Sequence, residues 1–144
     1  MPGGSHDVLE LSIPLTPVPK GRPRMKRRGK AYTPTPTRRY EEAVAWYVKS
    51  SLQGREPLQG PIAVELEFWL PIPRSWNQRK QGQARDRELL PTSKPDLGNL
   101  VKAVEDACNG LTWVDDSQIV QETARKAYSD QPRIILRMRP VTTF

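Results

Sequence analysis

The sequence has only one cysteine, Cys108, so the chain cannot form an internal disulfide. It has no run of 18 apolar residues, which argues against a membrane-spanning helix, and its start, MPGGSHDV, lacks the apolar centre of a signal peptide. Residues 1–6 resemble the remnant of an expression tag, so we assign no role to His6. These absences predict a soluble, cytoplasmic protein with one domain over residues 7–144, long enough to bury a core without disulfides.

Acidic residues are also absent between Lys20 and Arg39. Residues 1–55 hold eleven Lys and Arg against four acids, whereas residues 56–144 hold twelve of each, so the whole net charge of +7 lies in the first part. Prolines and Tyr32 are interleaved with the cations. This composition favours a loop that contacts the phosphates of a nucleic acid, and a solvated basic tail is the alternative. The nine cations are Lys20, Arg22, Arg24, Lys26, Arg27, Arg28, Lys30, Arg38 and Arg39.

Hydrophobic periodicity predicts the order strand, helix, strand, helix, strand, strand. Alternation of apolar residues predicts strands over residues 8–15, 62–70, 119–128 and 132–139. Apolar spacing of three and four residues predicts helices from Thr37 to Gly54 and from Asp96 to Gly110. The order is typical of an α+β domain, in which two helices pack on a small mixed sheet of about four to five strands.

The connections between these elements are also predictable. Pro14 indicates either an edge position or a bulge for the first strand. The Pro-rich, basic residues 16–36 predict a long loop with a short hairpin around Gly29, and residues 71–95 predict a second loop. Residues 112–114 indicate a further short strand, and the last two strands are expected to pair antiparallel across a turn at residues 129–132.

Carboxylates surround the second predicted helix. Residues 96–116 hold five acids and one cation, Lys102. Carboxylates from the helix start and from the later turn, Asp96 with Asp115 or Asp116, would make the all-oxygen site that Mg²⁺ or Mn²⁺ prefers. Such an ion polarises a phosphodiester and activates water. Lys102 could then neutralise the phosphate or protonate the leaving group.

Structural interpretations of the same residues remain open. Asp96 is an acceptable helix N-cap. Asp115 and Asp116, followed by serine, are also ordinary turn residues. Lys102 lies four residues before Asp106, with which it can form a surface pair of little energetic value.

The aromatic residues and the cysteine carry weaker signals. Cys108 lies on the apolar stripe of its helix, so we interpret it as a core residue and not as a nucleophile. Trp46, Trp69 and Trp113 occupy patterned positions that predict buried or half-buried rings. Trp76 lies in a predicted loop, where it either stacks on a base or packs against the protein.

Two blocks of sequence are similar to one nuclease family. KPDLGNLVKAVEDACNGLTWVDDSQI and VPKGRPRMKRRGKAYTPTPTRRYEEAV closely resemble segments of the RusA-type Holliday-junction resolvases, and the likeness covers most of residues 8–139. The resemblance implies a small α/β fold and a homodimeric, Mg²⁺-dependent endonuclease, with Mn²⁺ as a substitute ion. It also implies paired, symmetric nicks in four-way DNA junctions and a bacterial or bacteriophage origin.

The family motif reads Asp, any residue, Asp, Asn, Leu, then a Lys three residues after the Asn, and later a pair of Asp residues. The positions that match it are Asp96, Asn99, Lys102, Asp115 and Asp116. The resemblance implies catalytic roles for Asp96, Lys102 and Asp116. It implies metal ligation by Asp96 and by Asp116, the metal-binding member of the pair, with Asn99 in a supporting role. Asp115 is a further candidate metal ligand from the carboxylate pattern alone.

The second Asp of the motif is replaced by Gly98 in this chain. The loss of a ligand predicts weaker metal binding and weaker cleavage, with the fold and DNA binding kept. Asp115, Glu65 or Glu67 would compensate if the sheet placed them beside the site. The alternatives are a junction-binding protein of DNA recombination and repair with little or no cleavage, and a general basic nucleic-acid-binding module.

Overall fold

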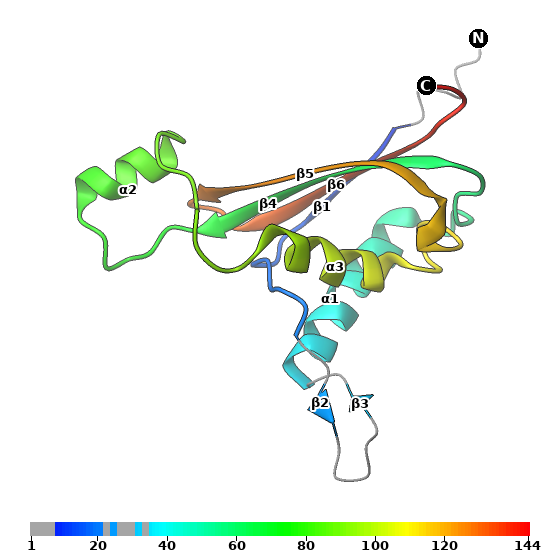
Figure 1. The fold of residues 1–144 in the computed structure, drawn as a ribbon, viewed down its shortest axis with the longest axis horizontal. Helices are drawn as coiled ribbons and strands as arrows, with labels where there is room; N and C mark the ends of the chain where they lie inside the picture. The colour runs from blue at the N-terminus through cyan, green and yellow to red at the C-terminus, as the bar shows by residue number, and fades with distance from the viewer. Residues whose placement is uncertain (1–7, 22–23, 26–30, 33–34) are drawn as a thin grey trace.

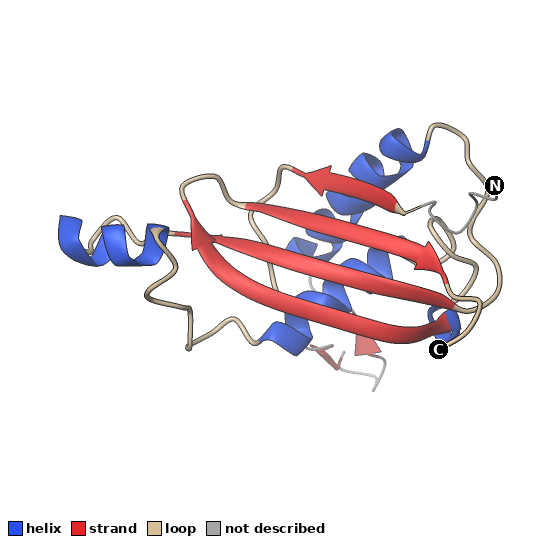
Figure 2. Ribbon diagram, turned by 90° about the horizontal axis from the view of Figure 1, so that it is seen from above, coloured by secondary structure: helices blue, strands red, loops and turns tan. Residues whose placement is uncertain are grey.

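The computed structural model describes residues 8–21, 24–25, 31–32 and 35–144. Its main sheet has the strand order β1-β6-β4-β5, with bounds β1 Leu9–Ile13, β4 Ile62–Pro71, β5 Ile119–Ser129 and β6 Arg133–Pro140. The helices are α1 Thr35–Leu52, α2 Gln78–Arg85 and α3 Leu97–Cys108, and a short 3-10 turn, η2, spans Asp116–Gln118. Helices α1 and α3 lie on one face of the sheet (Figure 1), and Figure 2 shows the other face in front of them. The expected α+β fold is confirmed.

Strand β4 lies between β6 and β5 in the sheet, and most of its residues are buried. Its even-numbered residues from Ile62 to Leu70 are at most 6% exposed and face the helices. On the opposite face, Glu67 and Trp69 are also buried. The alternation predicted for this strand is therefore present, and the charged partners that bury Glu67 come from neighbouring strands.

The expected antiparallel pairing of the last two strands is wrong. Strand β4 lies between β5 and β6: it runs parallel to β5, where Pro71 pairs with Ser129, and antiparallel to β6, where Trp69 pairs with Arg133. Residues 130–132 therefore connect two strands that are not neighbours. A β5–β6 hairpin would have left the apolar strand β4 with an open edge, whereas the observed order shields it on both sides.

Segment 71–95, predicted as a loop, contains helix α2. The helix sequence, QRKQGQAR, has no apolar stripe, and only Ala84 is buried. Its start is stabilised by Asn77, whose side-chain oxygen accepts a hydrogen bond of 2.8 Å from the backbone N–H of Lys80. Because this stabilisation is local and polar, hydrophobic periodicity did not detect the helix.

The basic segment and the 112–114 stretch have less regular structure. Strands β2 (Arg24–Met25) and β3 (Ala31–Tyr32) pair as a short hairpin, as expected around Gly29, beyond the start of α1 in Figure 1. The predicted strand at 112–114 is reduced to isolated bridges of Trp113. Strand β1 lies at the sheet edge, which is one of the two alternatives that Pro14 indicated.

The core lies between the sheet and the two covering helices. Leu100, Val104 and Cys108 of α3 are fully buried there, so the interpretation of Cys108 as a core residue is confirmed. Trp69 and Trp113 are buried as predicted, but Trp46 is 64% exposed. It lies two residues from the buried Val44 and Val48, which places it on the opposite side of α1. None of the helices in the described part of the chain has the length and apolar composition that a bilayer crossing requires.

Candidate active site

Asp96 lies at the N-terminal end of α3, and its carboxylate has no hydrogen bond or ion pair with the described residues. It occupies the N-cap position in an extended conformation, but its side chain makes no capping hydrogen bond. The residue is exposed, and it lines a groove with Asn99 of the first helical turn. Asp96 thus occupies the N-cap position, but its side chain does not cap the helix. Its carboxylate is therefore available to a ligand near the positive end of the helix dipole.

The loop before Asp96 is held by a lysine of β5. The Nζ atom of Lys126 donates hydrogen bonds of 2.8 Å to the carbonyl oxygens of Ser93 and Pro95. The backbone N–H of Asn99 donates to the carbonyl oxygen of Asp96 over 3.1 Å. These contacts tie the position of Asp96 to both the sheet and the helix.

Nothing in the structure requires a glycine at position 98. Its φ angle is not positive, since the positive-φ glycines are Gly54, Gly60 and Gly110. A Cβ atom at position 98 would meet no atom within 4 Å. The exposed position lies four residues before Lys102, on the same side of the helix. A carboxylate would therefore fit where the family motif has one.

Asp116 is fixed at the other end of α3. Its Oδ1 atom accepts a hydrogen bond of 2.6 Å from Nε1 of the buried Trp113, and its backbone N–H donates to Oδ1 of Asn109 over 2.9 Å. Asn109 is the residue that ends α3. The side chain of Asp116 therefore has a defined position beside the C-terminal end of the helix.

Asp115 stabilises the turn that carries Asp116. Its carboxylate accepts hydrogen bonds from the hydroxyl and the backbone N–H of Ser117, and Gln118 completes a capping box. The hydrogen bonds from Ser117 hold the pKa of Asp115 below its ordinary value. Asp115 thus has the structural role that its place in a turn predicted.

Asp96 and Asp116 do not converge within one chain, contrary to expectation. They flank α3, and the thirteen residue steps from Asp96 to Asn109, at about 1.5 Å each, separate them by about 20 Å. Figure 1 shows η2 beyond the end of α3 opposite to Asp96. In the part of the chain that the structure describes, no three His, Cys, Asp or Glu side chains are grouped so that they could hold a metal ion. The donors of one chain alone therefore do not fit a metal site.

Two further carboxylates lie near Asp116. Together with Glu105 of α3 and Glu122 of β5, it lines a cavity of about 330 Å³. Burial raises the pKa of Glu122, and the Oε2 atom of Glu105 is buried without a hydrogen-bond partner among the described residues. Sequence reasoning counted Glu105 among the acids but missed Glu122. No local signal identifies Glu122, because only the register of β5 brings it to this cavity.

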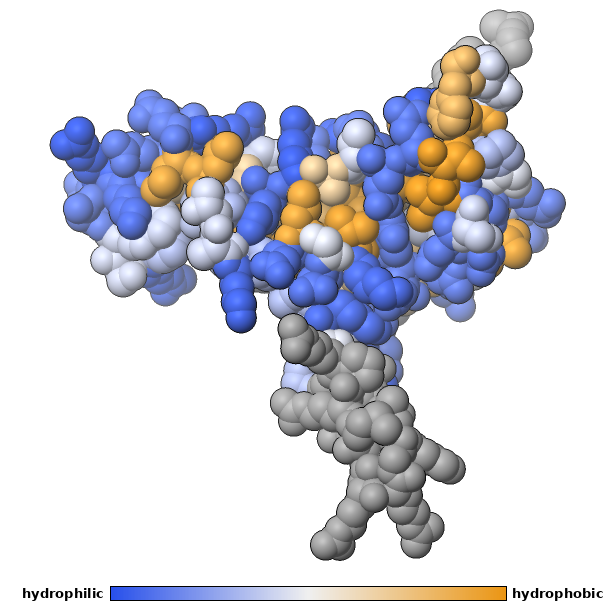
Figure 3. Space-filling model, viewed as in Figure 1, coloured by the Kyte–Doolittle hydropathy of each residue, from blue (hydrophilic) through white to orange (hydrophobic). Residues whose placement is uncertain are grey.

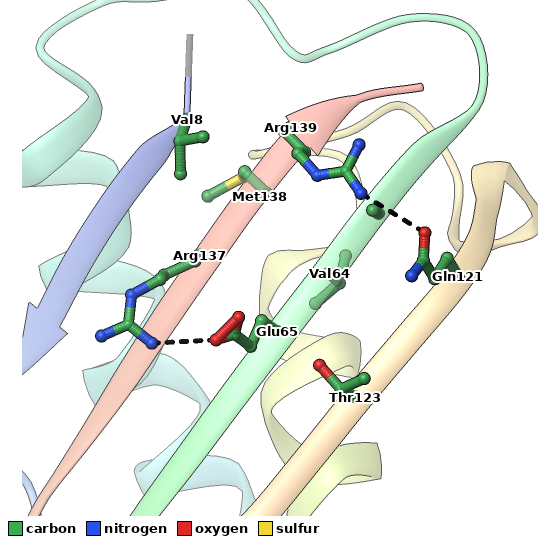
Figure 4. A pocket seen from close by; sticks show the side chains of 9 residues that line it. Val8, Val64, Glu65, Gln121, Thr123, Arg137, Met138 and Arg139 are labelled. Carbon is green, nitrogen blue, oxygen red and sulfur yellow. Dashed lines mark hydrogen bonds and ion pairs between the residues drawn. The ribbon is translucent and has the colours of Figure 1, made fainter. Parts of the chain in front are cut away.

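The compensation expected from Glu65 or Glu67 is excluded by the sheet. Both face away from α3 and belong to an ion-pair network on the opposite face. Arg137 lies 2.8 Å from Glu67 and 3.1 Å from Glu65, as Figure 4 shows for the latter pair, and Arg125 lies 2.6 Å from Glu67. The alternation of side chains along β4 separates these carboxylates from Asp96 and Asp116.

Two lysines near α3 form ion pairs. Lys102 is exposed, and its Nζ atom lies 3.4 Å from Oδ1 of Asp106. This is the surface ion pair that their spacing of four residues made possible. Lys20 lies 2.8 Å from Glu41 and 3.0 Å from Asp106, so it joins α1 to α3. Burial alone lowers the pKa of Lys20, but its hydrogen bonds to the two carboxylates outweigh this effect and raise it. The charge of Lys20 is thus already compensated by protein groups, unlike that of a free DNA contact.

The remaining predicted DNA contacts are only partly described. Arg38 and Arg39 are exposed near the start of α1, and Arg24 lies in β2. Five of the predicted DNA contacts lie outside the described part of the chain: Arg22, Lys26, Arg27, Arg28 and Lys30.

A family model described as "Endodeoxyribonuclease RusA" matches residues 14–139 of the chain. The chain belongs to the RusA family. RusA-family proteins are Holliday-junction nucleases that generally depend on a divalent metal. The chain is also 34% identical over 140 residues to "Uncharacterized protein YqaN" of Bacillus subtilis (strain 168). The alignment covers 94% of this chain and 99% of that protein. The RusA match includes both ends of α3, where Asp96 and Asp116 lie.

Proposed function

We propose that the protein is a Mg²⁺-dependent endodeoxyribonuclease that resolves four-way DNA junctions by paired symmetric nicks, and that two copies of the chain build each active site. Mn²⁺ is expected to substitute for Mg²⁺. The observation that carries this proposal is the placement of a free Asp96 and an acidic cavity around Asp116 at opposite ends of α3 in a RusA-family chain. The cellular role would be DNA recombination and repair in a bacterium or bacteriophage.

An antiparallel pair of α3 helices would bring the separated carboxylates together. Gly98, Lys102, Glu105 and Asn109 follow one another at intervals of three or four residues, so they form one stripe along α3. All but Glu105, which is partly buried, are exposed. If a second copy packs here about a two-fold axis, Asp96 of each chain approaches Asp116 of the other. Two equivalent sites arise from this symmetry, as two symmetric nicks require.

The pair of chains would supply the donors that one chain lacks. Asp96 of one copy and Asp116 of the other are the proposed ligands, and Glu105 or Glu122 would replace the carboxylate missing at Gly98. Oxygen donors of this kind suit Mg²⁺, which when bound polarises the phosphodiester. Lys102 lies on the same stripe, where its ammonium would stabilise charge on the phosphate. Asn99 would support Asp96, and Arg38 and Arg39 with the basic segment would hold the DNA backbone.

Cleavage of a synthetic four-way junction in the presence of Mg²⁺ tests this function. We expect symmetric nicks that disappear in Asp116→Asn, because this change keeps the size of the side chain and removes the charge of the ligand. Normal cleavage by Asp116→Asn would remove Asp116 from the site.

A mixing experiment tests the two-chain site separately. Chains with Asp96→Asn and chains with Asp116→Asn are each expected to be inactive. In their mixed dimer, one site combines an intact Asp96 with an intact Asp116, so nicking of one strand should return. A mixture of Asp96→Asn with the double variant Asp96→Asn/Asp116→Asn has no intact site and serves as the control. Absence of activity in the first mixture, with mixed dimers demonstrated, would contradict the two-chain site.

Gly98 favours one alternative function, a junction-binding protein with little or no cleavage. Loss of a carboxylate weakens metal binding and also reduces repulsion of phosphate. Band shifts of four-way junctions without product at any Mg²⁺ or Mn²⁺ concentration would select this alternative.

A further inference from the structure

A large groove opens beside Asp96, between the start of α3 and the segment that carries α2. Its volume is about 900 Å³, compared with about 200 to 330 Å³ for four other cavities lined by described residues. This volume lies near the upper end of the range of about 300–1,000 Å³ that is typical of ligand sites. Asp96 and Asn99 line the groove, so a molecule bound in it would lie next to the proposed active site.

The walls of the groove are apolar and rigid. Six prolines, which have no backbone N–H to offer, line it together with Trp76 and Tyr128. The two rings form an edge-to-face pair with centroids 5.3 Å apart. Both side chains are partly exposed. Partly exposed aromatic rings beside flat apolar walls are surfaces on which nucleobases stack.

The rim of the groove is positively charged. Lys94 lines it and is exposed. The Nζ atom of Lys80 lies over one face of the Trp76 ring, 4.1 Å from its centroid, in a cation–π contact. The segment 72–95, of which Lys94 lines the groove, holds six Lys and Arg against two acids, a net charge of +4. Figure 3 shows mainly hydrophilic residues at the α2 end of the molecule, on the left. An apolar floor with a cationic rim matches a flat base with its anionic phosphate, whereas a neutral proline-rich peptide would leave the rim unmatched.

We propose that this groove binds an unpaired nucleotide of the DNA strand that is cut. The base would contact Trp76 and Tyr128, and the phosphates would follow Lys94 and Lys80 toward Asp96. This inference rests on the proposed function, because it makes the groove the entry of a strand to that active site. It predicts that the substrate has unpaired bases at the branch point, since a base inside a duplex cannot reach the aromatic pair.

Metal-free binding of a short, fluorescein-labelled oligothymidylate, followed by fluorescence anisotropy, tests the groove. We expect Trp76→Ala to weaken binding by about tenfold, the loss typical of one base–aromatic stack, and Trp76→Phe to retain most of the affinity. Trp46→Ala is the matched control, because Trp46 is an exposed tryptophan of α1 outside the groove. Its affinity should equal that of the unchanged protein.

Wild-type affinity in a folded Trp76→Ala protein would overturn the proposal. If Trp76→Ala fails to fold, Lys94→Glu provides the second test: weaker oligothymidylate binding supports the groove, and unchanged binding overturns it. Metal-free binding of the oligothymidylate requires neither a bound ion nor cleavage. Failure of the groove is therefore distinct from failure of the nuclease, which is judged by junction cleavage and its loss in Asp116→Asn.

Discussion

At the scale of single residues, Gly98 combines a helical backbone with an exposed position that has room for a side chain. Glycine inside a helix costs about 1 kcal/mol relative to alanine, and less near the helix end. An Asp in the first turn also gains about 0.3–1 kcal/mol from the helix dipole. Gly98 thus lowers the stability of α3 and removes a carboxylate from the proposed site.

Gly98→Asp should raise both the melting temperature and the rate of junction cleavage. Gly98→Ala separates the two effects, because it restores helix propensity without restoring a carboxylate. We expect Gly98→Ala to raise the melting temperature measured by circular dichroism while leaving cleavage unchanged. Equal stimulation of cleavage by both variants would show that the carboxylate at this position has no role in catalysis.

Glu67 is a buried carboxylate whose charge is stabilised by arginines. Burial alone would raise its pKa, but hydrogen bonds from Arg137 and Arg125 outweigh this effect and lower it. A lowered pKa means that Glu67 contributes stability above about pH 4.5, and that this contribution disappears as the pH falls through the pKa of the folded state.

Glu67→Gln should lower the free energy of unfolding at pH 7 by about 1.5–3 kcal/mol, the range typical of hydrogen bonds to charged groups. The variant should also lose less stability on acidification than the unchanged protein. Urea unfolding at pH 7 and pH 4 measures both effects. Glu88→Gln, at an exposed position in the described chain, is the control. Parallel stability curves for Glu67→Gln and the unchanged protein would contradict this role.

At the scale of elements, β5 supports the loop that leads into α3. Lys126 of β5 binds two carbonyl oxygens of this loop, and Asp96 follows directly after it. Among the described residues, Lys126 donates hydrogen bonds to Ser93 and Pro95 and none to Asp96 itself. It is therefore a positioning residue, which acts through the loop on the proposed site.

Lys126→Met should reduce junction cleavage by about tenfold or more, because small displacements of a catalytic group reduce rates strongly. The methionine keeps the length of the side chain and removes its donors. The reduction should fall on kcat, with little change in KM, and steady-state cleavage over a range of junction concentrations measures both. Arg125→Met removes a cation from the adjacent position, which faces the other side of the sheet. A larger loss of cleavage in Arg125→Met than in Lys126→Met would contradict the positioning role.

At the scale of the whole molecule, positive and negative charges are concentrated in different regions of the chain, which match the proposed DNA-binding and metal-binding functions. The net charge of +7 comes from residues 1–55, which include the β2–β3 hairpin and the start of α1. Carboxylates gather at the C-terminal end of α3, and the cationic rim of the groove lies at its other end. Within one chain, the acidic cavity and the groove thus lie at opposite ends of α3.

Neutralising two arginines tests the basic surface. The double change Arg38→Gln/Arg39→Gln should weaken junction binding and make the log–log slope against salt less steep by about 1.8, if each arginine neutralises one phosphate at about 0.9 per contact. Binding measured over a range of NaCl concentrations gives the slope. The double change Arg74→Gln/Arg79→Gln, in the α2 segment, is the control, because it shows whether the loss of two cations elsewhere changes the salt dependence of binding equally. An unchanged slope in the first variant would exclude these arginines from phosphate contact.

The sequence by itself determined the elements whose signal is local. The apolar stripe of α3 predicts the helix, and the helix length then separates Asp96 from Asp116, because the rise per residue is constant. The alternation in β4 likewise predicts that Glu65 and Glu67 face away from the apolar side. Helix α2 was missed because its stabilising contacts are polar and its buried surface is small.

Only the tertiary structure decided which distant residues meet. The insertion of β4 between β5 and β6, and the register of β5, bring Glu122 to Asp116 and Lys126 to the loop before Asp96. The same arrangement places Tyr128 against Trp76 in the groove. These contacts depend on strand order and register, which arise from the packing of the whole sheet, so no pattern within one segment specifies them.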